Sequence, residues 1–278
     1  MELDLPISEQ LSLRIADAHE GQRGYPTARL QKGFRLVDHG HDLAEEAVGF
    51  GLPVLRQGLK TLFPGSVVLS RTASGGAWEV DARFTLNLEE RLARSSSGNI
   101  RWQWLYLLKN MSAELIRRFP AVRALLTACS SFLRGLFGWV TTYEDAGVAL
   151  IVRVKTAFDP QSGLLHVNVE PTDLVHTDIT EVVLMNEQGA HAFDTYQDAS
   201  GRILNGKEIG CWDEVSSSEA MFVSSLRRIA FRVFAASGAR LYRGRELVGN
   251  RLAWSGFGYA FPPGAGKFSY TLRIERLP

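Results

Sequence analysis

The fold is decided by residues 78–88, which read WEVDARFTLNL. Apolar side chains fill every second position of this stretch, and charged or polar side chains fill the positions between them. Such period-two alternation predicts a β-strand with one face in a core and the other face in water. Half-buried strands of this kind are typical of antiparallel sheets, because helices cover both faces of parallel sheets.

Further strands are expected on both sides of this one. They are predicted at residues 11–15, 148–156, 164–170, 181–185, 202–204, 207–211, 221–223, 227–234, 257–261 and 268–276. Turn signals separate them, among them residues 186–189 (NEQG) and the pair Asn205-Gly206, which favours a tight hairpin. Regular strand–turn spacing without helices in between predicts a sandwich.

One helical segment interrupts the β pattern, at about residues 100–139. Its apolar side chains recur at helical spacing, and residues 101–134 carry six basic and one acidic side chain. These charges leave no apolar run long enough to cross a bilayer. Packing on the core, or a homo-oligomer formed through residues 101–137, is favoured over binding to a membrane surface.

These patterns predict a mainly β fold over residues 1–278, which we expect to be a single domain. We expect a large antiparallel β-sandwich of two large sheets with an inserted helical hairpin at about 100–139. The segment 16–65, rich in Gly and Pro, is expected to be irregular.

Composition excludes several classes of protein. The 278 residues carry a net charge of +1, and the Arg-rich segment 227–251 lacks an RNA-binding signature, so nucleic acid is not expected as a partner. Cys129 and Cys211 are too few for a disulfide framework or a four-thiolate zinc site. Two thiols, and an N-terminus without a basic start and apolar stretch, predict a cytoplasmic protein.

Charge is distributed unevenly along the chain. Residues 158–219 contain twelve acidic and two basic side chains, whereas residues 222–251 contain seven arginines and one glutamate. The first interpretation is that neighbouring strands pair and neutralise each other across a sheet. The alternative is an acidic ligand-binding face beside a basic one.

The densest cluster of candidate ligands lies between residues 38 and 46. His39 and His41 follow a His-x-His spacing that many metal sites use, and Asp42 completes a weak candidate site for a divalent metal. His39 and Glu45 are also candidates to contact a bound ligand from this loop. A solvated polar loop without metal is the favoured alternative, and no other cofactor is expected.

Two further groups of residues suggest chemistry on polar hydroxylated ligands. His166, Asn168 and Glu170 share one face of a predicted strand, where His166 and Glu170 are candidate general acid and base groups. The alternative is a strand face that simply meets solvent.

The second group is Trp212, Asp213 and Glu214. An aromatic ring stacks on the apolar face of a sugar, while carboxylates bind its hydroxyls or transfer protons. Trp212 and Asp213 are therefore candidate ligand-binding residues and Glu214 a candidate catalytic one. An ordinary sheet edge is the alternative.

The chain resembles a known family in its architecture. Its many antiparallel strands, the early stretch 49–55 (GFGLPVL) and the last strand 268–274 (FSYTLRI) are similar to the β-supersandwich of galactose-mutarotase-like domains and of some polysaccharide lyases. The resemblance implies a carbohydrate on a concave sheet face. Mutarotases pair a histidine with a glutamate as acid and base, and His166 with Glu214 is the corresponding hypothesis here.

The sequence therefore favours a carbohydrate-binding or carbohydrate-processing protein with a polar site on one sheet face. The competing hypothesis is a non-catalytic interaction or assembly module, or a membrane-peripheral protein, that uses the basic helix pair.

Overall fold

The computed structural model describes residues 2–17, 30–45, 47–58, 60–94, 139–171, 174, 177–248 and 252–278. Residues 100–138 of the predicted helical hairpin lie outside the described residues, and so do Cys129 and the whole predicted oligomer surface at residues 101–137. The hairpin and its partners therefore stay predictions, and so does the single-domain organisation. In the described part, no helix is long and apolar enough to span a membrane.

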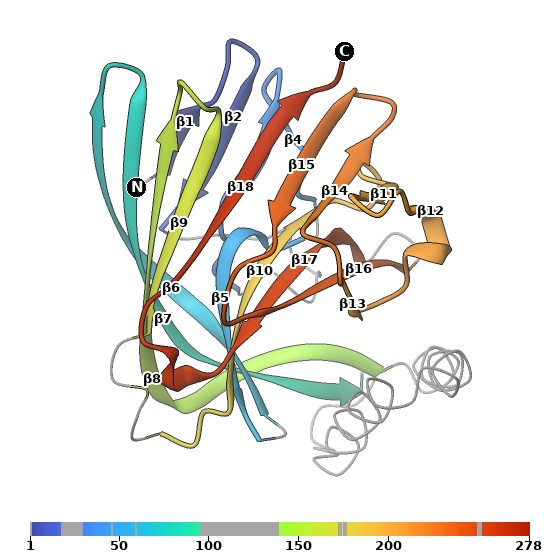
Figure 1. Cartoon of the computed structure of the whole chain (residues 1–278). Coiled ribbons are helices and arrows are strands. Elements are labelled where there is room, and N and C mark those ends of the chain that lie inside the picture. The colour runs from blue at the N-terminus through green and yellow to red at the C-terminus, as the bar shows by residue number, and fades with distance from the viewer. Residues whose placement is uncertain are drawn as a thin grey trace.

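The described chain is mainly β and forms two antiparallel sheets (Figure 1). The small sheet has four strands, in the order β1 (Glu2–Pro6), β2 (Leu11–Ala16), β3 (Arg35–Asp38) and β4 (His41–Asp42). The large sheet has fourteen, in the order β12 (Ile203–Asn205), β11 (Thr195–Asp198), β14 (Glu219–Ser224), β15 (Ile229–Phe234), β18 (Phe268–Arg276), β9 (Leu164–Pro171), β8 (Trp139–Asp159), β7 (Ala77–Arg94), β6 (Lys60–Ser74), β5 (Gly49–Gln57), β10 (Glu181–Gln188), β17 (Leu252–Phe261), β16 (Arg240–Val248) and β13 (Asp213–Glu214).

The large sheet folds back on itself. Phe50 of β5 lies 5.1 Å from Phe231 of β15, ring centroid to ring centroid, although six strand positions separate the two in the sheet order. The ring centroids of Tyr259 on β17 and Tyr270 on β18 are 4.4 Å apart, although these strands are also distant in the sheet order. The first half of the sheet (β12 to β9) therefore faces the second half (β5 to β13) across one apolar core. The prediction of two separate large sheets is corrected, because a single sheet supplies both layers.

The strand that decides the fold behaves as its pattern predicts. Residues 78–88 lie inside β7, where Val80, Ala82, Phe84 and Leu86 are fully buried. We call the face of each half that meets this core the inner face, and the opposite face the outer face.

The described part of segment 16–65 carries β3, β4, β5 and the start of β6, so the prediction of irregular chain is wrong for these residues. The first seven residues of β5 are all buried, so both faces are covered and no alternation marks the strand. Gly49 and Gly51 adopt positive φ angles of 88° and 69°, which only glycine tolerates easily. Their presence in β5 gives this segment the composition of a loop.

Two local predictions are wrong for reasons of hydrogen bonding. A turn is predicted at residues 186–189, but β10 runs to Gln188 because its amide bonds two backbone groups of the segment before β4, Leu36 N (3.0 Å) and Phe34 O (3.2 Å). A strand is predicted at residues 207–211, but Gly206–Ile209 form a short 3₁₀ helix. The carboxylate of Glu208 accepts a hydrogen bond from the Asn205 amide at 3.2 Å and closes that turn.

The small sheet is fastened to the large one by a buried charge. Asp38 is 3% exposed and accepts a hydrogen bond from Arg227 at 3.0 Å. Arg276, near the end of β18, pairs with the same carboxylate. Leu13 and Leu36 of the small sheet belong to the common core.

Candidate functional site

The outer face of the second half brings together polar and aromatic side chains from four strands. Phe257 and Tyr259 of β17 point into the core, so Gly258 and Ala260 belong to the outer face. Cross-strand partners share a face of a sheet. From β17 towards β13, the register pairs Ala260 with Arg240, Gly258 with Tyr242, and Tyr242 with Glu214. Arg240, Tyr242 and Glu214 therefore lie on one continuous outer face.

Glu181 at the start of β10 binds two arginines on this face. Arg240 Nη2 lies 2.7 Å from its Oε1, and Arg56 Nη1 lies 3.1 Å from its Oε2. The carboxylate side chain is only 13% exposed, whereas that of Arg240 is 56% exposed. Burial alone would lower the pKa of Arg240, but Tyr242 and Glu181 outweigh it and raise the pKa above its ordinary value. Arg240 is thus a fixed cation that remains accessible to a ligand.

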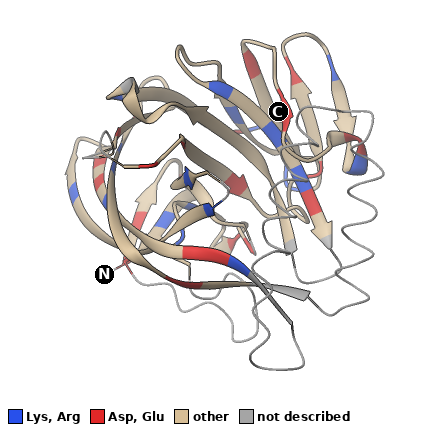
Figure 2. Cartoon of the chain, turned by 90° about the horizontal axis from the view of Figure 1, so that it is seen from below, with Lys and Arg blue, Asp and Glu red and all other residues tan. Residues whose placement is uncertain are grey.

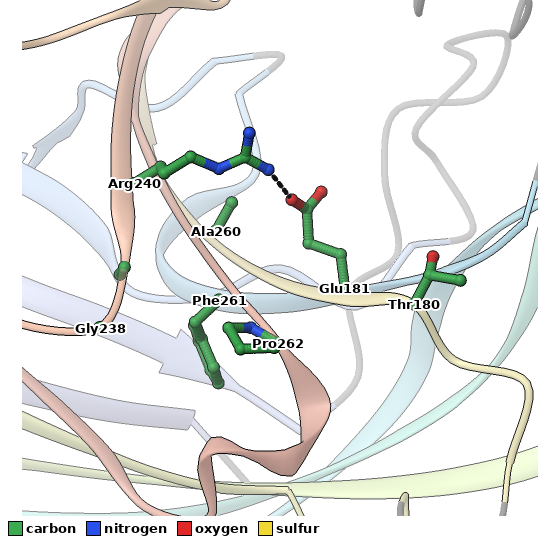
Figure 3. Close-up of a pocket in the computed structure, with 8 residues that line it drawn as sticks. Thr180, Glu181, Gly238, Arg240, Ala260, Phe261 and Pro262 are labelled. Atoms are coloured by element: carbon green, nitrogen blue, oxygen red, sulfur yellow. Dashed lines mark hydrogen bonds and ion pairs between the residues drawn. The ribbon is translucent and has the colours of Figure 1, made fainter.

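A pocket of about 340 Å³ adjoins this ion pair (Figure 3). It is lined by Thr180, Glu181, Gly238, Ala239, Arg240, Ala260, Phe261 and Pro262. Its volume falls at the small end of the range of about 300–1,000 Å³ that is usual for small-molecule sites. The pocket combines an apolar floor with one carboxylate and one guanidinium, which suits a small ligand that carries both hydroxyls and C–H faces.

Aromatic rings continue the face beyond the pocket. The Arg240 guanidinium lies 5.6 Å from the centroid of the Tyr242 ring, a cation–π distance. The Trp212 ring lies over Gly258, where a Cβ atom added to the glycine would sit 2.6 Å from ring atom Cζ3. Trp212 also packs on Trp254, with centroids 5.2 Å apart.

Only two members of the predicted group Trp212, Asp213 and Glu214 lie beside the pocket. Asp213 pairs in register with Arg243 and contacts its Nη2 at 3.5 Å, on the other face of the strand. Arg243 is itself buried and lies 4.8 Å from the Tyr196 ring centroid. Asp213 therefore joins an internal contact, while Trp212 and Glu214 remain candidates to meet a ligand.

The predicted group on β9 lies on the outer face of the first half. Leu165, Val167 and Val169 enter the core, so His166, Asn168 and Glu170 point away from it. The core thus separates His166 from Glu214, and the structure does not bring this hypothetical acid–base pair together.

Ion pairs and hydrogen bonds occupy two members of the β9 group. Glu170 contacts Lys267 at 3.0 Å and Arg153 at 3.6 Å. The hydrogen bond from Lys267 lowers the pKa of Glu170, which favours its ionised form and disfavours a role as general acid. Asn168 accepts a hydrogen bond from Ser269 Oγ at 2.6 Å. A catalytic role of His166 stays a prediction.

The candidate metal loop forms the turn from β3 to β4. Asp42 pairs with Arg35 and also accepts a hydrogen bond from the Ala44 amide at 2.8 Å. Among the residues that the structure describes, no group of three or more His, Cys, Asp or Glu side chains could hold a metal ion. His39 and His41 are exposed, so the favoured alternative of a solvated loop fits their placement. Glu45 lies beside Gly189 rather than beside the pocket.

The uneven charge distribution is explained largely by pairing across strands. Glu181 with Arg240, Glu219 with Arg232, and Asp213 with Arg243 each join the acidic segment to the basic one. Figure 2 accordingly shows acidic and basic residues interleaved along the strands. The first interpretation of the charge pattern is confirmed for Glu219 with Arg232 and for Asp213 with Arg243, whose strands are neighbours, whereas β17 lies between the strands of Glu181 and Arg240.

Sequence reasoning missed Glu181, Arg240 and Tyr242 as site residues. The charge segregation signalled that the two segments pair, but it could not indicate which pair lines a pocket. Arg240 and Tyr242 are two residues apart on one strand, and this spacing carries no signal of its own.

The sequence matches no family model and no curated protein. Among solved structures, the fold is similar to α-N-acetylgalactosaminidase NagBb from Bifidobacterium bifidum. The complex with Gal-NHAc-DNJ aligns with a TM-score of 0.52 at 12% identity, and the GalNAc complex with 0.52 at 11%. Both alignments cover 99% of this chain and 36% of NagBb, so the chain spans about a third of that protein.

A galactose mutarotase-like protein from Lactobacillus casei ATCC 334 aligns over 99% of both chains, with a TM-score of 0.38 at 9% identity. At such identities the likeness concerns architecture alone. The chain shares its fold with about a third of NagBb, and the likeness to polysaccharide lyases stays a prediction.

Proposed function

We propose that this chain binds a carbohydrate on the outer face of β10, β17, β16 and β13, with the Glu181–Arg240 pocket as the main point of attachment. The observation that carries the proposal is the meeting of this pocket with Tyr242, Glu214 and Trp212 on one face. A carboxylate and a guanidinium bind neighbouring hydroxyls of a sugar, and an aromatic ring covers its C–H face.

Binding is favoured over hydrolysis. Glycosidases commonly use two carboxyl groups, one as acid and one as nucleophile or base. On this face Glu181 already binds two guanidinium groups, which leaves Glu214 as the exposed carboxylate beside the pocket. The NagBb structures include complexes of that protein with GalNAc and Gal-NHAc-DNJ, and the shared fold supports the choice of ligand class without locating the site.

The test is a glycan array followed by isothermal titration of the full chain with galactose and N-acetylgalactosamine. We expect Arg240→Ala and Glu181→Gln to weaken binding at least tenfold. The matched control is Arg232→Ala, which breaks two ion pairs on the outer face of the first half and should leave affinity within twofold. Equal losses in Arg240→Ala and Arg232→Ala, or no binding to any glycan, would overturn the proposal.

A further inference from the structure

Trp212 and Trp254 form a second feature of the same outer face, a pair of packed rings that we call the platform. Trp212 and Trp254 lie 5.2 Å apart with an angle of 31° between their planes. Trp254 is 7% exposed and its Nε1 donates to Glu246 at 3.3 Å, whereas Trp212 is only partly buried. Trp254 thus forms the fixed base, and Trp212 presents the accessible ring.

Two glycines on adjacent strands clear the space for these rings. A Cβ atom at Gly258 would lie 2.6 Å from Trp212 Cζ3, and one at Gly244 would lie 2.6 Å from Trp254 Cη2. Real Cβ atoms do not approach other atoms this closely, so any larger residue would displace a ring. The two glycines therefore leave the room that the indole rings occupy on this face.

The backbone of Trp212 is held in an unusual conformation. Its φ angle is +60°, a region that favours glycine and is costly for a bulky side chain. Such strain persists only where the surrounding structure enforces it, and it commonly occurs at ligand-binding positions. Here the conformation lays the ring over Gly258 and places Glu214 two residues further along, on the same face as Tyr242.

The platform adjoins the pocket but is separate from it. Gly258, beneath Trp212, and Ala260, in the pocket lining, are two residues apart on β17 and share its outer face. At about 3.4 Å per residue they are about 7 Å apart, which is farther than one pyranose ring covers. Tyr242 bridges the two positions, since it pairs with Gly258 and lies under the Arg240 guanidinium.

We propose that the ligand is an oligosaccharide whose terminal sugar occupies the Glu181–Arg240 pocket and whose next sugar stacks on Trp212, with Glu214 binding its hydroxyls. This inference rests on the proposed function and adds to it a second subsite and a minimum chain length. It predicts an affinity that rises with the number of sugar rings, because the second ring gains the aromatic contact.

The experiment is titration of the full chain with two series, galactose to galactotriose and N-acetylglucosamine to chitotriose. We expect at least one disaccharide to bind tenfold or more tightly than its monosaccharide. Trp212→Gly should abolish this gain, whereas the control Gly264→Ala, where a Cβ meets nothing within 4 Å, should keep it. Glycine adopts the positive φ angle of this position without strain, and circular dichroism checks that the variant is folded. Trp212→Phe should retain part of the gain.

The outcomes separate the two proposals. A chain that binds monosaccharides through Arg240 without any gain from a second ring refutes the oligosaccharide inference alone. A gain that persists undiminished in Trp212→Gly also refutes it. Absence of binding by every saccharide in both series and on the array removes the proposed function together with the inference.

Discussion

Glu187 offers the sharpest test of the folded architecture. It is 4% exposed on β10, on the outer face next to Gly256, whose lack of a side chain leaves room for its Cγ. Burial raises the pKa of its carboxyl to about 8, and the charge of Glu246 adds to the rise. A hydrogen bond from the Val48 amide and the charge of Lys32 act in the opposite direction without cancelling it.

The effect on stability follows from the direction of this shift. An unperturbed glutamate titrates near 4.5, so the folded state holds the proton of Glu187 more tightly than the unfolded state. Its contribution to the free energy of unfolding is fully present below about pH 4.5 and is lost as the pH rises through about 8. With about 1.4 kcal/mol for each pH unit, the loss reaches roughly 3 kcal/mol by pH 7.

Glu187→Gln removes the titrating group but keeps an oxygen that accepts the hydrogen bond from the Val48 amide. We expect the variant to match the parent chain near pH 4.5 and to become progressively more stable than it, by about 3 kcal/mol at pH 7. Urea unfolding followed by circular dichroism at pH 5, 6, 7 and 8 measures the difference, in which other titrations cancel.

Two results would refute this reasoning. A difference that does not change with pH would mean that Glu187 does not titrate in this range. A parent chain that gains on the variant as the pH rises would mean that the carboxylate is ionised and paired with Lys32. Glu170→Gln is the control, and the difference in unfolding free energy between it and the parent chain should change with pH in the opposite direction. The reason is that Lys267 lowers the pKa of Glu170 in the folded chain.

Three further substitutions test particular contacts. Asp38→Asn leaves two arginines facing each other without a carboxylate and should cost about 3 kcal/mol in urea unfolding; a loss below about 1 kcal/mol would contradict the fastening role of this buried charge. Gly258→Ala should expel the Trp212 ring and weaken disaccharide binding, whereas Gly264→Ala, where a Cβ meets nothing within 4 Å, should change neither binding nor melting temperature. Asn186→Ala should lower the free energy of unfolding by about 3 kcal/mol, because it leaves a buried hydroxyl and a buried amide without their acceptor. An unchanged free energy of unfolding would show that water replaces the side chain.

How much of this molecule the sequence predicts depends on how many faces of each strand are covered. Residues 78–88 alternate because only the inner face of β7 is buried, and their strand is correct. In β5 both faces are buried, so alternation disappears and the pattern is typical of irregular chain. Asn186 and Gln188 mislead in a related way, because amides that commonly mark turns here satisfy backbone groups inside the core.

The sequence singled out only two residues of the candidate site and missed the ion pair that lines its pocket. Trp212 and Glu214 were recognisable as an aromatic beside an acid, and both lie near the pocket. His166 and Glu170 satisfied the same chemical reasoning, yet they lie across the core from it. Period-two patterns assign a residue to the inner or outer face of its own strand, but the folding of the sheet decides which outer faces lie together.

The two outer faces differ in a way that bears directly on function. On the first half, ion pairs occupy charged side chains, as where Arg232 bridges Glu219 and Glu275. On the second half, Tyr242 and Trp254 are only 8% and 7% exposed although they lie on the outer face of their strands. Sequestration on an outer face excludes water from aromatic and charged groups, which strengthens their contacts with a ligand. The same covering of both faces that hides these strands from a sequence pattern therefore limits a ligand to the exposed parts of this outer face, such as the Arg240 side chain, which is 56% exposed.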